Sequence, residues 1–330
     1  MDFEFTAEQL ALRDTVRAYL SRPDDPQWSI LGGQLGLTGL AVAEKCGGSG
    51  ASLVEVALAV QEAGRVLLSL PYLSTVTAAA ALDPDLAGDL LAGIAAGSTV
   101  AALAVEGSAT ARRDGSGYRL DGVLRHVLDG GRAGVAVVAA RCDGQPGRYA
   151  VRAEDLACEV HPTLDQTREQ ATLTLVDSPA VLVSREPGGV DLLHAMLAVE
   201  SVGVAEASLA MTVAHLRTRE QFGLPLAAFQ ALRHRVADLA VSIAAATSAA
   251  WYAVRVAGTD EFRVAAPVAK LYATETAYAV TAESIQLHGG IGFTWEHPAH
   301  RYFKRATANR LLHGDPVSLR RTIGARAGLQ

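Results

Sequence analysis

Two stretches in the C-terminal half of the chain carry its most specific sequence pattern. One reads Arg217-Thr218-Arg219-Glu220-Gln221-Phe222-Gly223-Leu224-Pro225, and the other reads Gln286-Leu287-His288-Gly289-Gly290-Ile291-Gly292-Phe293. In the first, a helix ends at a glycine-proline turn beside an arginine, whose guanidinium can bind a diphosphate through paired hydrogen bonds. In the second, a helix ends in glycines, whose bare backbone a ligand can approach closely. Taken singly, each stretch is more typical of an ordinary interhelical turn or helix C-cap.

The segments around these stretches are predicted to be long helices. Helical periodicity with few breakers extends over residues 192–218, 227–257, 260–287 and 302–312. A last helix is expected from Pro316 to about residue 327, with Asp315 as its N-cap. Because these segments are rich in alanine and allow close approach, residues 187–330 are predicted to form a helical bundle.

The remaining sequence divides into two zones. Residues 1–98 are predicted to be helical: Thr6 caps a first helix that Pro23 and Pro26 end, 47–50 form a loop, and 52–70 form another helix. Residues 99–186 hold short β-rich runs at 99–105, 118–122, 134–140, 149–151 and 172–175, separated by turn residues. This pattern predicts a small β-barrel or sandwich. The fold class is therefore α+β, mainly α, in three regions, although the length alone suggests about two domains.

Composition excludes several classes of function. The chain has 330 residues and a net charge of −6 without a basic tract, which argues against a nucleic-acid partner. Three scattered cysteines favour a reducing cytoplasm over a disulfide framework. The longest uncharged stretches, 66–82 and 239–254, fall short of the roughly 20 apolar residues of a membrane span, and the acidic start at residues 1–4 is unlike a signal peptide.

Common catalytic motifs are absent from the sequence. It contains no Walker A, HExxH, serine-elbow or Rossmann glycine pattern. Glu296, His297 and His300 form a polar cluster, but their spacing matches no closed zinc set. We therefore expect no metal site.

Together, and in this order on a bundle, the two stretches resemble the acyl-CoA dehydrogenase family, flavoenzymes that desaturate the α–β bond of acyl thioesters. The resemblance covers nearly the whole chain. It extends to the following segments: Phe5-Thr6-Ala7-Glu8-Gln9, Gly36-Leu37-Thr38-Gly39-Leu40, Gly47-Gly48-Ser49-Gly50, Gln61-Glu62-Ala63-Gly64-Arg65 and Ile323-Gly324-Ala325-Arg326. It implies an N-terminal helical domain (1–98), a middle β domain (99–186) and a C-terminal four-helix bundle (187–330). The patterns of helical and β-rich segments predict the same layout independently.

The resemblance also implies an FAD site. In the family, the two bundle motifs bind the adenosine-diphosphate half of an FAD that belongs to the neighbouring subunit. Carried over to this sequence, Arg219 would bind the pyrophosphate and Phe222 would lie against the linker side of the flavin. The cofactor-binding set is completed by Gln286, Gly289 and Gly290 along the nucleotide and by two polar neighbours, Gln221 and Gln230. For Gln230, helix capping is the alternative role.

Two departures from the family pattern concern the flavin ring. The threonine-glutamate pair of a β-domain loop is missing from residues 104–110, where we expect a shorter loop. In a second flavin segment, His126 stands where the family has an aromatic wall and Leu128 stands where it has a hydroxyl. Because leucine cannot donate a hydrogen bond, the ring site of this chain is predicted to have decayed.

A third departure concerns the catalytic base. Desaturation needs a carboxylate that removes the α-proton, yet His313 occupies the usual position and Leu193 the alternative one. Glu200, about two turns beyond Leu193, and His313 itself stay open as bases, with a structural role favoured for each. No catalytic residue is therefore assigned.

Retained nucleotide motifs beside a degraded ring site predict a shared active site. The chain resembles the short subunit of actinobacterial α2β2 acyl-CoA dehydrogenases that act on steroid side-chain CoA thioesters. A longer homologue would supply the flavin pocket and the catalytic glutamate, with an acyl-CoA substrate and an electron-transfer acceptor as further partners. The alternatives are an autonomous homo-oligomeric flavoenzyme and a non-catalytic scaffold subunit.

Overall fold

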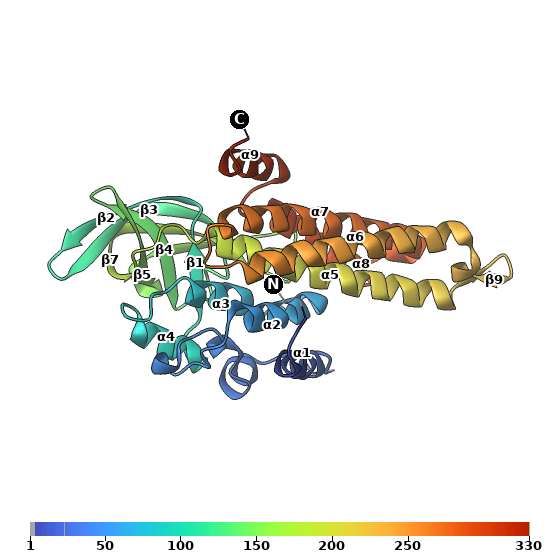
Figure 1. The fold of residues 1–330 in the computed structure, drawn as a ribbon, viewed down its shortest axis with the longest axis horizontal. Coiled ribbons are helices and arrows are strands. Elements are labelled where there is room, and N and C mark those ends of the chain that lie inside the picture. Colours follow the sequence, from blue (N-terminus) through green and yellow to red (C-terminus); the bar gives the residue numbers. More distant parts are fainter. Residues whose placement is uncertain (1–3, 23, 330) are drawn as a thin grey trace. The chain divides into compact units, whose positions relative to one another are not determined.

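The computed structural model describes residues 4–22 and 24–329 (Figure 1). Pro23 and the first three residues of the acidic N-terminus, for which the sequence makes predictions, lie outside this part. Contacts divide the chain into two compact units, which are described separately below: residues 1–59 with 69–193, and residues 60–68 with 194–330.

The N-terminal region is helical, as the sequence predicts. Its elements are α1 (Ala7–Leu20), a π-helix (Ser29–Gln34), short 3₁₀ turns (Leu37–Gly39 and Glu44–Cys46), α2 (Leu53–Arg65), α3 (Tyr72–Ala80) and α4 (Gly88–Ala95). Thr6 caps α1: its hydroxyl accepts from the Gln9 amide, while the Gln9 side chain accepts from the Thr6 amide. This reciprocal capping box confirms the predicted start of the first helix.

The second predicted helix ends earlier than residue 70. α2 stops at Arg65, because Leu67 adopts a left-handed conformation with φ of +52°. The Leu68 amide then donates back to the Ala63 carbonyl at 2.9 Å. Such a reversal caps the last turn of a helix, so the prediction of a helix over 52–70 was wrong at its C-terminal end.

The middle region is a closed β-barrel rather than a sandwich. Its strands are β1 (Ala101–Ala104), β2 (Gly107–Asp114), β3 (Gly117–Leu128), β4 (Val135–Cys142), β5 (Gln145–Arg152), β6 (Ala157–His161) and β7 (Gln170–Ser184). The ring runs β4-β2-β3-β7-β5 and returns to β4, with β1 added to β4 and β6 added to β7. Apolar side chains such as Leu120, Leu124, Val138 and Leu173 fill the core.

The expected loop at 104–110 is mostly strand. Only Val105 and Glu106 separate β1 from β2, and from Gly107 onward the segment pairs with β3. The sequence predicts a shortened loop here, but backbone pairing with Leu124 and its neighbours extends β2 through this segment.

The C-terminal region is helical: α5, α6, α7 and α8 run alongside one another, and the short α9 lies outside this group (Figure 1). They are α5 (Val190–Thr218), α6 (Gln230–Arg255), α7 (Phe262–His288), α8 (Ala299–Leu311) and α9 (Pro316–Arg326). Asp315 caps α9 by accepting from the amides of Val317 and Ser318, as predicted. In the same unit, Gly203 of α5 lies so close to residue 61 that an added Cβ would meet the Gln61 carbonyl oxygen at 2.0 Å. A small residue is therefore required at this crossing.

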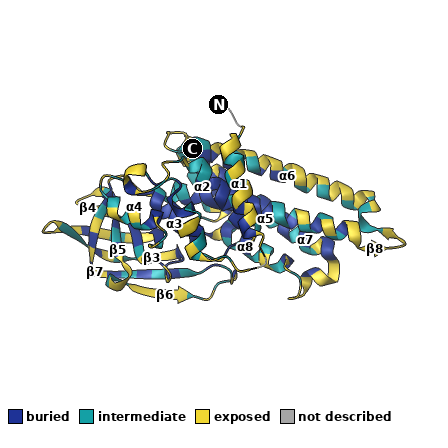
Figure 2. Cartoon of the chain, turned by 90° about the horizontal axis from the view of Figure 1, so that it is seen from below, coloured by how far each residue is buried: buried dark blue, intermediate teal, exposed yellow. Residues whose placement is uncertain are grey.

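By length and composition alone, α5 and α6 could cross a membrane, a test that core helices of other proteins also pass. In the most apolar window of α5, 67% of the residues are buried, as in a core helix. In the corresponding window of α6 only 28% are buried, and Figure 2 shows this helix largely exposed. Within its own unit, α6 therefore has an exposed apolar face.

Candidate functional site

The first signature stretch folds into a tight hairpin after α5. The two-residue strands β8 (Glu220–Gln221) and β9 (Leu224–Pro225) flank a turn at Phe222 and Gly223, with φ of +56° and +77°. Positive φ at both central residues is typical of a type I′ turn and disfavours a bulky residue such as phenylalanine by about 1–3 kcal/mol. The Phe222 side chain is nevertheless 91% exposed. An exposed aromatic ring held in an unfavourable backbone conformation indicates a contact residue.

The second signature stretch leaves its backbone open. α7 ends at His288, and Gly289 follows with φ of +63°. A Cβ added at Gly289 or at Gly290 would meet no atom within 4 Å, so a ligand has room to approach the main chain. The Gln286 side chain is exposed beside them.

A stack of histidine rings joins the two stretches at one end of the bundle. The ring of His215, near the end of α5, lies 4.5 Å from that of His288, which lies 4.3 Å from that of His297. The seven residues predicted to bind the cofactor flank this stack, and all of them are exposed. They are Arg219, Gln221, Phe222, Gln230, Gln286, Gly289 and Gly290. Their role stays a prediction.

Two rings of the stack, those of His215 and His297, have lowered pKa values, which favours their neutral form. Burial lowers the pKa of His215 and of His297, and charge repulsion from His288 adds to this effect in both. Nδ1 of His288 lies 2.7 Å from the Ser284 carbonyl oxygen. Its Nε2 is buried and has no hydrogen-bond partner within residues 4–22 and 24–329. The stack thus places an unsatisfied polar atom directly before Gly289.

The sequence pattern did not predict a cavity or a histidine stack at this end of the bundle. A cavity of about 300 Å³ lies between the end of α5 and the start of α6, and its lining includes Arg217 and Arg233. His215 and His297 were also missed as members of the stack. The only signal in the sequence is that both histidines lie near predicted helix ends. Stacking also depends on which helices become neighbours, and the sequence pattern does not specify this.

Both candidate bases occupy structural positions. The Glu200 carboxylate is 2% exposed and accepts from Nη1 of the fully buried Arg305 at 2.9 Å and from the Asn309 amide at 2.8 Å. His313 is buried with φ of +54°, and its carbonyl oxygen lies 2.8 Å from Nε2 of His194. These contacts support the structural roles that the sequence favours for both residues.

The two altered flavin-ring positions lie in the barrel. His126 has φ of +52° where the register of β3 against β7 shifts, and its Nε2 lies 3.9 Å from a Glu106 carboxylate oxygen. Leu128 is 2% exposed and packs as an ordinary core residue. Their correspondence to a lost ring site stays a prediction.

The Glu296, His297 and His300 cluster does not converge on a point. His297 stacks on His288, and the ring of His300 packs edge-on against Trp295 at 4.8 Å. Among the described residues, no group of three or more His, Cys, Asp or Glu side chains could hold a metal ion.

Known proteins match nearly the whole chain. Residues 6–84 match the family "Acyl-CoA dehydrogenase, N-terminal domain" and residues 191–328 match "Acyl-CoA dehydrogenase, C-terminal domain". Acyl-CoA dehydrogenase IpdE2 of Mycobacterium tuberculosis is 35% identical over 304 residues, covering 91% of this chain and 86% of that protein.

Two solved structures have the same fold. One is the Tcur3481-Tcur3483 steroid ACAD (G363A variant), with a TM-score of 0.88 and 30% identity over 97% of this chain and 98% of that one. The other is the ChsE4-ChsE5 complex of Mycobacterium tuberculosis, with a TM-score of 0.90 and 26% identity over the full length of both chains.

The histidine stack predicts a loss of stability in mild acid. Because the folded chain holds the pKa of His215 and His297 below the ordinary 6.5, the unfolded chain binds protons more readily as pH falls through that value. The melting temperature should therefore decrease between about pH 7.5 and about pH 5.5. His215→Asn should reduce this decrease, whereas His234→Asn, at an exposed position on α6, should leave it unchanged. Equal pH dependence in wild type and His215→Asn would contradict the role of the stack.

The Glu200 network predicts a large effect on stability. Glu200→Ala removes a buried carboxylate that pairs with the Arg305 guanidinium and should lower the free energy of unfolding by about 3–5 kcal/mol in urea denaturation. As a matched control, Glu283→Ala removes the ion-pair partner of Arg235. Because this pair is more exposed than the Glu200–Arg305 pair, its loss should cost less than about 1 kcal/mol. A folded Glu200→Gln variant that loses turnover in the active complex would instead identify Glu200 as the base.

Proposed function

The chain belongs to the acyl-CoA dehydrogenase family, and on that premise we propose that it is the short subunit of a hetero-oligomeric acyl-CoA dehydrogenase. In this proposal it binds the adenosine-diphosphate half of a shared FAD. A longer homologue supplies the flavin-ring pocket and the catalytic glutamate for α,β-desaturation of an acyl-CoA thioester. The assembly is α2β2, works in the cytoplasm and passes its electrons to an electron-transfer acceptor.

One observation carries the proposal. The two signature stretches, which lie at the C-terminal ends of the separate helices α5 and α7, meet beside the His215–His288–His297 stack with their predicted cofactor-binding side chains exposed. Phe222, with 91% of its side chain exposed, is the extreme case. Exposed aromatic and guanidinium groups gathered at one place are typical of a surface that another molecule covers.

The residues at this end of the bundle fit a dinucleotide. Arg219 would donate hydrogen bonds from its guanidinium to the pyrophosphate. The open main chain at Gly289 and Gly290 would lie along the nucleotide, since no side chain occupies that space. His288 Nε2, buried and unsatisfied within the described part, offers a further polar contact. When bound, FAD supplies the hydride acceptor for desaturation.

The missing base supports a partner that completes the site. In this chain the Glu200 carboxylate is engaged by Arg305 and Asn309, so it does not face a substrate. The position expected from the family holds the buried His313 instead. A carboxylate that removes the α-proton would therefore come from another subunit.

The surface of α6 offers a place for that partner. Ala237, Val241, Ala244 and Ser248 recur at helical spacing and are exposed, with Val241 at 70%. Small side chains let another helix approach closely, and a stripe of this kind is costly to leave in water.

The names of the two structural relatives each join two components, and one calls its protein a steroid ACAD. We extend both features, a paired assembly and a steroid-derived thioester, to this protein.

Expression with and without the partner tests the proposal. Purified alone, the chain should retain little FAD and show no dehydrogenase activity, because only half of the cofactor site is present. Co-expression with a longer homologue should yield a yellow, active complex with one FAD per heterodimer, measured by flavin absorbance. An active, flavin-loaded homotetramer from this chain alone would overturn the proposal, and two FAD per heterodimer would favour autonomous sites.

Arg219→Ala tests the assigned contact to the pyrophosphate. Removing a charge-assisted hydrogen bond of about 1.5–3 kcal/mol should weaken FAD retention in the complex roughly tenfold or more, measured as flavin released on dilution. Arg321→Ala removes another exposed arginine of the same unit, on α9, and should leave FAD retention unchanged. Flavin content that is indifferent to Arg219 would favour a scaffold without cofactor contact.

A further inference from the structure

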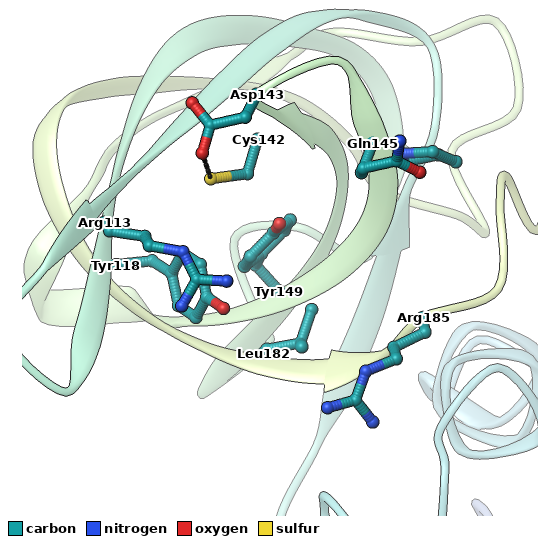
Figure 3. Close-up of a pocket in the computed structure, with 9 residues that line it drawn as sticks. Arg113, Tyr118, Cys142, Asp143, Gln145, Tyr149, Leu182 and Arg185 are labelled. Atoms are coloured by element: carbon teal, nitrogen blue, oxygen red, sulfur yellow. Dashed lines mark hydrogen bonds between the residues drawn. The ribbon is translucent and has the colours of Figure 1, made fainter.

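A second cavity opens at one end of the β-barrel, within the first unit. Its volume is about 500 Å³, inside the range of roughly 300–1,000 Å³ typical of small-molecule sites. It lies where the β2–β3 turn, the β4–β5 turn and the end of β7 meet (Figure 3). The lining residues are Arg113, Tyr118, Cys142, Asp143, Gln145, Pro146, Tyr149, Leu182 and Arg185.

The lining carries excess positive charge. Arg113 and Arg185 contribute two guanidiniums, against the single carboxylate of Asp143. In the part of the chain that the structure describes, neither arginine forms an ion pair, although several other exposed barrel arginines do. The Arg113 guanidinium lies 5.7 Å from the centre of the Tyr118 ring, which holds it beside the cavity. Two guanidiniums without counter-charges are suited to an anionic group.

Two tyrosines, set at an angle to each other, supply aromatic surface and hydroxyl groups to the lining. The rings of Tyr118 and Tyr149 meet edge to face at 5.0 Å, and Tyr149 is only 3% exposed. Burial raises the pKa of the Tyr149 hydroxyl, so this group stays a hydrogen-bond donor at neutral pH. Burial likewise raises the pKa of the Cys142 thiol, which lies 3.7 Å from an Asp143 carboxylate oxygen (Figure 3). Aromatic surface beside fixed polar groups is typical of a site for a ring compound.

Cys142 and Tyr149 of the lining belong to the hydrophobic core of the barrel, whereas the arginines, Asp143 and Gln145 do not. The interior of the barrel is closed by apolar side chains such as Leu120, Leu124 and Val138. A barrel of this size can be filled entirely with such residues. Two arginines, a carboxamide and a carboxylate gathered around an open volume therefore indicate binding.

We propose that this barrel-end cavity binds a nucleoside monophosphate. The phosphate lies against the guanidiniums of Arg113 and Arg185, and the flat base packs on Tyr118 and Tyr149. The sugar hydroxyls donate to Asp143 and exchange hydrogen bonds with the Gln145 carboxamide. This site is separate from the bundle residues assigned to FAD, and it does not depend on the function proposed above.

Calorimetric titration of the full chain with adenosine 5′-monophosphate tests the site. We expect saturable binding that Arg185→Ala and Arg113→Ala each weaken about tenfold, because each loses a charge-assisted hydrogen bond. Arg185→Lys should recover part of the affinity, since it restores charge but not the paired geometry. Arg152→Ala, at an exposed arginine of the same barrel outside the cavity, is the matched control and should bind like wild type.

Two probes, each lacking one part of the nucleotide, define the ligand class. Adenosine lacks the phosphate and inorganic phosphate lacks the base, so each should bind at least about tenfold more weakly than the nucleotide. Equal binding of either probe, or no saturable binding at millimolar nucleotide, would overturn the proposal. Because FAD contains the same nucleotide, Arg219→Ala is included. Loss of binding in Arg219→Ala but not in Arg185→Ala would move the nucleotide to the bundle and reject the barrel site, while supporting the FAD contact.

Discussion

The buried ion pair between Glu200 and Arg305 is the constraint on which the second unit depends. Both side chains are almost completely removed from water, at 2% and 0% exposure, so neither charge tolerates the loss of the other. Arg305 also donates to the Leu68 carbonyl, and Asn309 satisfies the second oxygen of Glu200. The pair thereby joins α5, α8 and the segment 60–68. The same arrangement engages Glu200, the carboxylate that the sequence leaves open as a base.

The open end of the bundle follows a different rule from its interior. Inside, Thr212 and Ser284 are paired at 2.7 Å, although the buried Ser208 hydroxyl has no partner among the described residues. At the end, Phe222 is exposed in a strained turn and His288 keeps an unsatisfied nitrogen within the described part. Natural proteins tolerate such local costs mainly at functional sites. The exposed aromatic in a strained turn therefore supports the ligand contact proposed at this end of the bundle.

Local signals could be predicted from the sequence, and contacts between distant segments could not. Thr6 and Asp315 act on neighbouring amides, so their capping roles are encoded within a few residues. The early end of α2 depends on Leu67 adopting a left-handed conformation that its residue type disfavours. The stack at His215 requires that α5 and α7 become neighbours, which periodicity does not specify. For the same reason, the motif residues were predictable as a set, while the cavity beside Arg233 was not.

A shared cofactor makes assembly and cofactor binding a single equilibrium. On the proposed function, each subunit alone holds only part of the FAD contacts, so affinity in the isolated chain is low. In the complex, the contacts of Arg219 add to those of the partner, and ligand binding then stabilises the assembled state by mass action. The free energy gained at Arg219 therefore appears both as flavin retention and as resistance of the complex to dissociation. On the proposed function, this coupling gives the nucleotide motifs of this chain a role although the catalytic base comes from its partner.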